Sequence, residues 1–546
     1  MMINKRFINR ILGLLYALAI VAGFEASCFG ALRLDSVWTY FFTILITVIA
    51  SLFFKTVWEY IYSRPRRKVM PVSDTGKNKP FLYFAIIWTA YFIVFLGVYP
   101  GFFCYDAQYE LTETVARSFD NQHPLLHVLS MGGIIQAVHK ITGDYNISIA
   151  AFILFQMTVI ALVLTFLVYF LTRLSLTKKE GIILSIYFGV FPVLAMYALC
   201  SSKDGMFGAF LILTIIYLRR LFTAPDTFFE DKKNSVILIV SLILMMLMRN
   251  NGVYAFAVYL VFIALWLFIG KYFKKIDKTV VKKALVLFAL AIVIFAAADK
   301  GMKAATHAKS VGHREILTVP IQQLARVYSY DGESLSTKEK EEILRYLPEE
   351  ALRSYIPKCS DMVKIGFNEE EFLKDKKGFF DIYFKLLFKH PTTYLNAWVM
   401  TSYGLYYPAA VIDGYKGAQM FTFVYGDSSY FGYEVEEPGS RHSLIPFIDS
   451  FYKWLSLDVT IQKIPIVSLL FSPGFLLWIM LFLLGYLIYT KQVALSITYL
   501  LPIAVMLTSM IGPMSLVRYS YFLWITVPML AVEIINIKRN DNEKDS

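Results

Sequence analysis

Four stretches of an otherwise apolar chain hold side chains that could do chemistry. The first, VYPGFFCYDAQYELTETVARSFDNQHPLLHVL at residues 98–129, places an acid among aromatic, amide and imidazole groups. CSSKDG, MRNNG and RYSY each add a basic residue. The candidates in these four stretches are Tyr105, Asp106, Gln108 and His123; Lys203 and Asp204; Arg249 and Asn250; and Arg518 and Tyr519.

These side-chain types suit a ligand that carries phosphate. Basic residues bind phosphate oxygens, and a carboxylate within hydrogen-bond reach of a hydroxyl can act as its general base. Taken singly, each candidate has a plainer explanation: an Asp at a helix end is usually an N-cap, and an outer Lys or Arg often anchors a helix at the lipid headgroups. A His-Pro pair such as residues 123–124 is ordinarily a turn. The case for a site therefore depends on whether the four stretches lie on one side of a membrane.

The segments that must position these residues are long and apolar. Of the 546 residues, 57% are hydrophobic and 17% are charged, whereas soluble domains carry about 25% charged residues. Runs of about 17–25 apolar residues recur without the period-2 alternation of barrel strands. The predicted spans are 11–31, 36–54, 81–99, 147–171, 181–199, 205–221, 235–248, 252–270, 283–299, 465–489, 492–511 and 518–537. We therefore predict an all-α polytopic membrane protein with about 12 transmembrane helices.

Lysine and arginine in the short connections indicate which side faces the cytoplasm. The basic residues of alternate connections are Lys5, Arg6, Arg10, Arg64, Arg66, Arg67, Lys68, Arg173, Lys178, Lys179, Arg219, Arg220, Lys232, Lys233, Lys271, Lys274, Lys275, Lys278, Lys538 and Arg539. The predicted crossings place all of them in the cytoplasm, so we expect both termini inside and the four candidate stretches outside. The net charge of +12 is then a topology signal, and nucleic acid is not an expected partner because no basic patch lies on a folded domain.

The spans divide the chain into four parts. These are a helix pair with a basic cytoplasmic linker (1–80), a membrane core with a long outer loop at 100–146 (81–299), a mainly helical external region (300–462), and three membrane helices with a cytoplasmic tail (463–546). The external region holds 19 basic and 21 acidic residues, which suits contact with water. Whether it forms a separate domain or lies along the membrane surface stays open.

The YPG…YDxQ…HP pattern of residues 99–124, together with the order of the loops, resembles a known family. That family is the GT-C superfamily of integral-membrane glycosyltransferases, and especially a bacterial branch of it. Residues 313–336, HREILTVPIQQLARVYSYDGESLS, resemble the segment that follows the core in this branch. The resemblance covers the topology of about residues 81–299 and implies a GT-C-like core, with catalytic positions that match Asp106 and Asp204.

The resemblance implies inverting transfer of a sugar from a polyprenyl-phosphate-linked donor, undecaprenyl phosphate in a bacterium. The acceptor would be a hydroxyl of a cell-envelope glycan, lipid or protein on the extracytoplasmic face of the plasma membrane. Asp106 would be the general base, and Asp204 would orient the acceptor or a metal. Lys203, Arg249 and Arg518 would stabilise charge on the departing phosphate. The expected substrate-binding residues are Tyr105, Gln108, His123, Asn250 and Tyr519.

Two departures from the family pattern leave parts of this mechanism open. Residues 1–54 place two helices before the core, and the first outer loop has one Asp instead of an adjacent acid pair. The sequence requires no cofactor, but a divalent metal (Mg²⁺ or Mn²⁺) shared by Asp106 and Asp204 stays open. The four cysteines have no metal-ligand spacing; Cys104 and Cys200 are expected near the outer surface, as two thiols or as a disulfide.

Two other classes of protein share the arrangement of membrane helices with an outer polar face. A polysaccharide polymerase or ligase would also use a lipid-linked donor, with a different core. A secondary transporter or lipid flippase would match twelve crossings, but it would carry charge near the middle of the bilayer and show related halves. The sequence has few charges at the helix centres and no repeat, so glycosyl transfer is the expected function and the polymerase or ligase is the main alternative.

Overall fold

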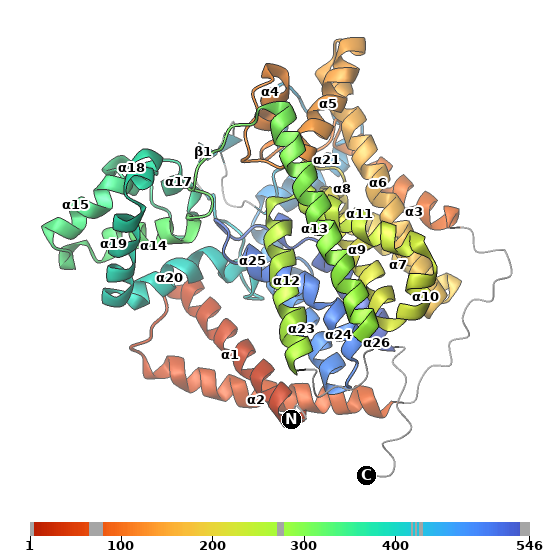
Figure 1. Cartoon of the computed structure of the whole chain (residues 1–546), viewed down its shortest axis with the longest axis horizontal. Coiled ribbons are helices and arrows are strands. Elements are labelled where there is room, and N and C mark those ends of the chain that lie inside the picture. Colours follow the sequence, from red (N-terminus) through yellow and green to blue (C-terminus); the bar gives the residue numbers. More distant parts are fainter. Residues whose placement is uncertain are drawn as a thin grey trace.

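The structure is a computed structural model, and it describes residues 5–64, 80–269, 278–416, 419–420, 423–424 and 430–535. These residues are predominantly helical (Figure 1). Strands occur in the described part only as β1 (Gln419–Met420) and β2 (Phe423–Val424), which pair antiparallel. Of the basic residues expected in the cytoplasm, Arg66, Arg67, Lys68, Lys271, Lys274, Lys275, Lys538 and Arg539 lie outside the described residues.

The chain begins with a helical hairpin. α1 (Lys5–Phe29) packs along α2 (Val37–Ser63); α1 begins before the span expected at 11–31, and α2 ends after the span expected at 36–54. Glu25 closes the turn between them, because its carboxylate accepts hydrogen bonds from the Thr39 hydroxyl (2.5 Å) and the Arg33 backbone N–H (2.8 Å). The predicted helix pair at the N-terminus is therefore present as a single packed unit.

The predicted membrane core contains a continuous succession of helices. They are α3 (Phe81–Gly97), α4 (Ala107–Ala116), α5 (Leu125–Thr142), α6 (Tyr145–Leu174), α7 (Lys178–Val190), α8 (Pro192–Ala198), α9 (Asp204–Thr223), α10 (Pro225–Glu230), α11 (Lys232–Met248), α12 (Asn250–Ile269) and α13 (Lys278–Thr306). The long outer loop expected at 100–146 is itself largely helical, since it contains α4 and α5.

The next helices form a compact module beside the bundle (Figure 1). They are α14 (Thr318–Tyr330), α15 (Thr337–Tyr346), α16 (Glu349–Arg353), α17 (Asp361–Lys364), α18 (Glu369–Lys374), α19 (Lys376–Lys389) and α20 (Pro391–Ser402). Residues of α14, α15, α18 and α19 share one hydrophobic cluster that is separate from the core of the bundle. Ser336 caps α15 in a capping box with Glu339, and the break expected at Pro391 is the start of α20.

The remaining helices return to the bundle. They are α21 (Pro446–Leu457), α22 (Val467–Leu470), α23 (Pro473–Tyr489), α24 (Val493–Thr498), α25 (Leu500–Ser509) and α26 (Leu523–Ile535), with the 3₁₀ turn η5 (Val517–Tyr519) before α26. The last three predicted spans are therefore interrupted: 465–489 by the break between α22 and α23, 492–511 at Tyr499, and 518–537 by η5 and the residues after it.

Five of the described helices are long and apolar enough to cross a membrane, namely α1, α2, α6, α9 and α13. A sixth span results if α7 and α8, which meet at a bend of 64°, are taken together. Shorter apolar segments are α3, the part Asn250–Leu265 of α12, α23 and the pair α24–α25. The chain is thus a helical membrane protein, as predicted, while the number of twelve crossings stays a prediction.

The bend between α7 and α8 corrects the expectation of one straight helix at 181–199. Pro192 is the first residue of α8, and Phe191 before it has extended backbone angles (φ −65°, ψ 122°). A residue that precedes proline is disfavoured in the helical region by contact with the proline ring. The apolar run continues through this point, so hydropathy alone conceals the break.

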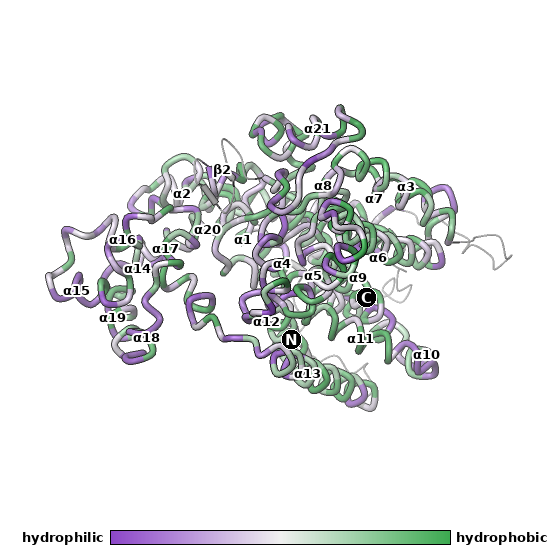
Figure 2. Tube along the Cα trace, turned by 90° about the horizontal axis from the view of Figure 1, so that it is seen from above, coloured by the Kyte–Doolittle hydropathy of each residue, from purple (hydrophilic) through white to green (hydrophobic). Residues whose placement is uncertain are grey.

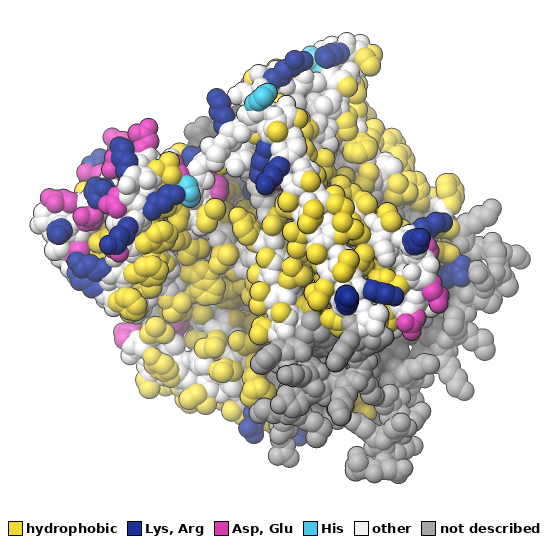
Figure 3. Space-filling model, in the orientation of Figure 1, with side chains coloured by type: hydrophobic (Ala, Val, Ile, Leu, Met, Phe, Trp, Pro, Cys, Tyr) yellow, Lys and Arg dark blue, Asp and Glu magenta, His cyan; other side chains and the backbone are white. Residues whose placement is uncertain are grey.

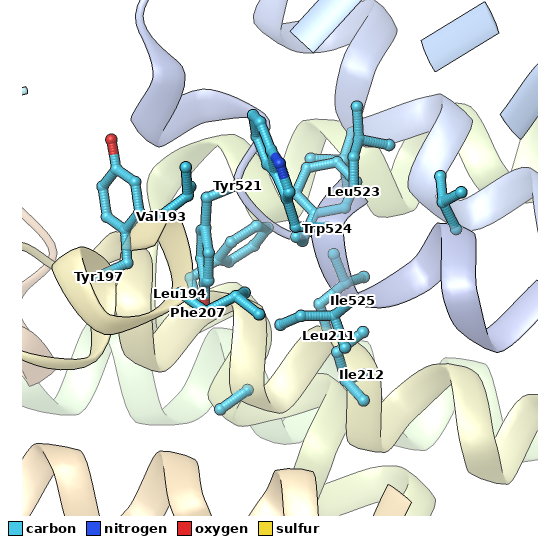
Figure 4. Packing of buried hydrophobic residues seen from close by; sticks show 14 of the residues in the cluster. Val193, Leu194, Tyr197, Phe207, Leu211, Ile212, Tyr521, Leu523, Trp524 and Ile525 are labelled. Atoms are coloured by element: carbon cyan, nitrogen blue, oxygen red, sulfur yellow. The ribbon is translucent and has the colours of Figure 1, made fainter. Parts of the chain in front are cut away.

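The core of the bundle lies around α9. Of the most apolar window of α9, 72% is buried, against 22% for α2 and 17% for α13, so the last two present apolar surface outward. Figure 4 shows the packing around α9: Phe207 lies beside Tyr521, and Leu211 and Ile212 lie beside Ile525. Figure 2 shows that hydrophobic residues follow the bundle helices, whereas hydrophilic residues gather in the α14–α19 module.

Candidate active site

Asp106 stands at the N-terminal end of α4 without capping it. Its side chain makes no hydrogen bond to the first turn of α4, so the plain N-cap explanation does not hold. The preceding residue, Tyr105, has a φ of 69°, a strained region for a non-glycine residue that tends to occur at functional sites. The Tyr105 hydroxyl accepts a hydrogen bond from the Gly432 N–H (3.0 Å), which fixes this strained turn.

Backbone pairing joins the loop of Asp106 to the loop of Lys203. Phe102 N–H donates to Leu199 O (2.9 Å), and Ser201 N–H donates to Phe102 O (2.9 Å). The Cys104 and Cys200 sulfurs lie 3.7 Å apart as two free thiols. Two loops that are almost 100 residues apart in the sequence are therefore held side by side.

Lys203 is shared among three acceptors. Its Nζ lies 2.9 Å from Asp106 Oδ2, 3.4 Å from Glu110 Oε1 and 2.9 Å from His123 Nδ1. Arg518, which belongs to η5, donates from Nη1 to the same Asp106 oxygen at 3.3 Å. Three distant loops thus contribute two carboxylates, one imidazole and two cations to a single cluster, which we call the Asp106 cluster (Asp106, Glu110, His123, Lys203 and Arg518).

Glu110 is a member of this cluster that sequence reasoning did not select. It is 2% exposed, and its carboxylate lies 2.6 Å from His127 Nδ1 as well as near Lys203. Glu110 follows Asp106 by four residues at the start of α4, a spacing that places the two on one side of the helix. That spacing was the available signal, and it requires the loop to be helical.

Burial and charge set the protonation of the cluster. Burial would raise the pKa of Asp106, but Lys203 and Arg518 outweigh it and hold the pKa well below its ordinary value. Burial would also raise the pKa of Glu110, but the neighbouring His127 and Lys203 lower it to about 2. Burial and the Lys203 ammonium lower the pKa of His123. Burial alone would lower the pKa of Lys203, but the negative charges of Asp106 and Glu110 raise it by more, so this pKa lies above its ordinary value. Both carboxylates are ionised at neutral pH, and His123 is neutral.

Asp204 and Arg249 form a second pair beside the cluster. The Asp204 carboxylate lies 3.1 Å from Arg249 Nη1. The Arg249 guanidinium lies over the Tyr519 ring at 4.7 Å, and Arg518 lies over the same ring at 5.1 Å. Tyr519 therefore contacts both cations and links the Asp204 pair to the Asp106 cluster.

The other predicted substrate-binding residues, Gln108 and Asn250, lie at the edge of the Asp106 cluster. The Gln108 backbone N–H donates to Glu436 (2.8 Å), and the Asn250 side chain donates to Gln122 O (3.2 Å) on an exposed loop. Neither side chain joins the Asp106 cluster by a recorded hydrogen bond. Glu436 was not predicted, because nothing in FGYEVEEPGS connects that segment to the first loop.

The side chains around Asp106 fit a resident divalent metal poorly. Asp106, Glu110 and His123 offer ligand atoms that all lie within 4.8 Å of one another, and carboxylate and imidazole are suitable donors. However, the Lys203 ammonium lies within hydrogen-bond distance of all three, where it would repel a metal. Asp204, the other predicted ligand, pairs with Arg249 instead.

Comparison with known proteins gives one relationship. No curated protein and no solved structure matches the chain significantly. A model described as a family of unknown function, DUF6020, matches residues 88–546, a range that includes every residue of the Asp106 cluster. The chain therefore belongs to the DUF6020 family.

Proposed function

We propose that this protein is a GT-C-type glycosyltransferase that moves a sugar from a polyprenyl-phosphate-linked donor to a cell-envelope acceptor. The observation that carries the proposal is the convergence of Asp106, Lys203 and Arg518 from three loops. A carboxylate with two cations supplies a proton acceptor beside groups that bind phosphate. The finer topology belongs to the same proposal: twelve crossings, a GT-C-like core over residues 81–299, both termini in the cytoplasm, and the site on the extracytoplasmic face of a bacterial plasma membrane.

The donor phosphate would bind between Lys203 and Arg518. The N-terminus of α9 begins next to Lys203, and a helix of this length adds a partial positive charge and free N–H groups at that end. Arg249 is neutralised by Asp204, so its role in this proposal is to keep Tyr519 and Arg518 in place. These groups would stabilise the negative charge that grows on the lipid phosphate as the glycosidic bond breaks.

Asp106 would become a stronger base when the donor binds. With Lys203 and Arg518 at hydrogen-bond distance its pKa is low, which makes it a weak acceptor for a hydroxyl proton. A phosphate would draw both cations toward its own oxygens, and the loss of their field at Asp106 would raise the pKa. The acceptor hydroxyl would therefore lose its proton only when the donor is in place, which limits transfer to the complete complex.

The test is the Asp106→Asn variant, with the purified protein in proteoliposomes. The substrates are radiolabelled sugars on undecaprenyl phosphate, offered with cell-envelope glycan, lipid and protein fractions as acceptors. We expect the wild type to transfer at least one sugar and Asp106→Asn to lose about 10²–10⁴-fold in rate, as removal of a general base does.

The control is Asp120→Asn, in the same outer loop, since the Asp120 carboxylate bonds Tyr109 and the Gln122 backbone rather than the cluster. It is expected to keep the wild-type rate and thermal midpoint, while Asp106→Asn is assayed at a temperature below its own midpoint, where it is folded. Normal transfer by Asp106→Asn, or no transfer by the wild type from any donor, would overturn the proposal.

A further inference from the structure

One face of α19 carries three exposed phenylalanines. Phe380, Phe384 and Phe388 are 37%, 50% and 81% exposed. They are four residues apart, so they lie on one side of the helix, and the rings of Phe380 and Phe384 stack with centroids 6.3 Å apart. A soluble surface rarely carries a continuous aromatic stripe of this kind without an occupant.

The opposite side of α19 already faces the core of its module. Phe379, Ile382 and Leu386 are buried in the hydrophobic cluster that holds α14, α15, α18 and α19 together. The exposed phenylalanines are therefore additional to what folding of the module requires. Lys385 and Lys389 of the same helix pair with Glu339 of α15 at 3.1 and 2.9 Å.

The stripe lies close to the membrane because of how the module is attached. α19 leads directly into α20, and α20 is bonded to the turn between α1 and α2: the Leu32 N–H donates to Asn396 Oδ1 at 2.7 Å. Arg326 of α14 donates to Gly30 O of the same turn (3.0 Å). α1 and α2 are both long and apolar enough to cross a membrane, so the turn between them marks a membrane boundary.

The start of α2 supports this placement. Val37 and Trp38 are 72% and 62% exposed, and Trp38 clusters with Phe41 and Phe42. Exposed aromatic rings at the end of a membrane helix are typical of the headgroup region. Figure 3 shows that hydrophobic side chains lie along the side of the module next to α1, while charged side chains cover its outer side.

We propose that the Phe380–Phe384–Phe388 face of α19 docks on the lipid surface at the α1–α2 turn, with the aromatic rings among the lipid headgroups. The docking rests on α19 and on the attachment of α20, and it is independent of the proposed glycosyl transfer.

The experiment places a nitroxide label on the full-length protein in vesicles of phosphatidylethanolamine and phosphatidylglycerol. Cys28 is the exposed thiol among the four cysteines, so Cys28→Ser is the background for Phe384→Cys, with Phe388→Cys as a second position. Lys338→Cys, on the exposed side of α15, is the control. Relaxation by oxygen, which concentrates in lipid, is compared with relaxation by a water-soluble nickel chelate.

We expect the oxygen-to-nickel ratio to be roughly threefold or more higher at residues 384 and 388 than at residue 338, as for an interfacial helix. Equal ratios at the three positions would show that the face lies in water and would overturn the proposal. Protection of residue 384 from both reagents would mark a protein partner and would overturn it as well. Because no transfer is measured, either result leaves the proposed function to its own test.

Discussion

The two ends of α9 carry ion pairs of opposite design. At one end, Arg219 meets Glu533 of α26 in a two-point contact, Nε to Oε1 at 2.7 Å and Nη2 to Oε2 at 3.1 Å. At the other end, Lys203 divides its ammonium among three acceptors, and Asp106 divides one oxygen between two cations. The first arrangement is one-to-one, and the second is shared.

The two ends of α9 also differ in how many buried side-chain atoms make no hydrogen bond. Arg518 Nε and His127 Nε2 are buried without a protein hydrogen bond in the described part of the chain, and the buried Asp204 oxygens have the ion pair with Arg249 but no hydrogen bond there, whereas the charged atoms of Arg219 and Glu533 show no such deficit. Buried polar atoms without partners cost free energy, and such costs are expected at sites that serve a function rather than stability. We therefore interpret the Arg219 end as an anchor and the Lys203 end as a reactive site.

Arg219→Ala is expected to give the largest effect, and it acts on stability. It leaves the Glu533 charge buried and alone, which typically costs about 3 kcal/mol or more, so the thermal midpoint in detergent should fall clearly. Arg220→Ala is the matched control, because the Arg220 guanidinium bonds the neutral Asn234 side chain (3.3 Å) and lies over aromatic rings but makes no ion pair among the described residues. Replacing both partners, Arg219→Met with Glu533→Leu, should restore much of the loss. Equal thermal midpoints for Arg219→Ala and Arg220→Ala would show that the Arg219–Glu533 pair does not anchor α9.

Lys203→Met is expected to give the next effect, and it acts on rate. Loss of one preorganised cation at a developing charge costs about 10²–10³-fold in turnover, while Arg518 still pairs with Asp106 and limits the loss of stability. The control is Lys309→Met, an exposed lysine outside the Asp106 cluster. A large fall in midpoint with unchanged transfer would mean that the Lys203 end is an anchor too.

The smallest effect expected is a pH dependence that belongs to Glu436. Burial raises the pKa of this carboxyl to about 8, so the folded state holds a proton that the unfolded state releases above its ordinary pKa of about 4.3. Stability contributed by Glu436 is therefore complete below that pKa and is lost as pH rises through about 8. Glu436→Gln should therefore reduce the pH-dependent loss of unfolding free energy by on the order of 2 kcal/mol.

Glu437→Gln is the matched control for the pH experiment, because Glu437 is exposed and next in sequence. Thermal midpoints at pH 5, 7 and 9 provide the measurement. If the thermal midpoint of Glu436→Gln depends on pH as that of the wild type does, Glu436 is not protonated at neutral pH. The expected difference between a protonated Glu436 and an ionised Asp106 would then be wrong.

The most useful information in the sequence was the side of the membrane on which each loop is predicted to lie. Lys203 and Arg518 could be placed with Asp106 because all three flank apolar segments on the same predicted face. What could not be predicted is which carboxylate pairs with which cation: Asp204 lies one residue from Lys203 but takes Arg249. Such pairing depends on side-chain direction at a helix start, where one residue turns the side chain by about 100°.

Helix breaks and long-range contacts were the other limits. The bend at Pro192 has a local cause that the sequence displays, but the apolar run through it favoured one span. Glu436 and Arg441 reach the first loop from more than 300 residues away: Arg441 donates to Gly101 O (2.9 Å), and Glu436 accepts from Gln108. No periodicity or motif encodes these contacts, because they arise only when the bundle closes.

The two-point contact of Arg219 with Glu533 also determines how α9 can move. With one end fixed to α26, a displacement of the other end is a tilt about Arg219 rather than a slide along the helix axis. Asp204 lies about 22 Å from that pivot at 1.5 Å per residue, so a tilt of about 3° carries Lys203 by about 1 Å. A hydrogen bond is gained or lost over that distance, so a small rotation of one helix is enough to transfer Lys203 from Asp106 to a ligand.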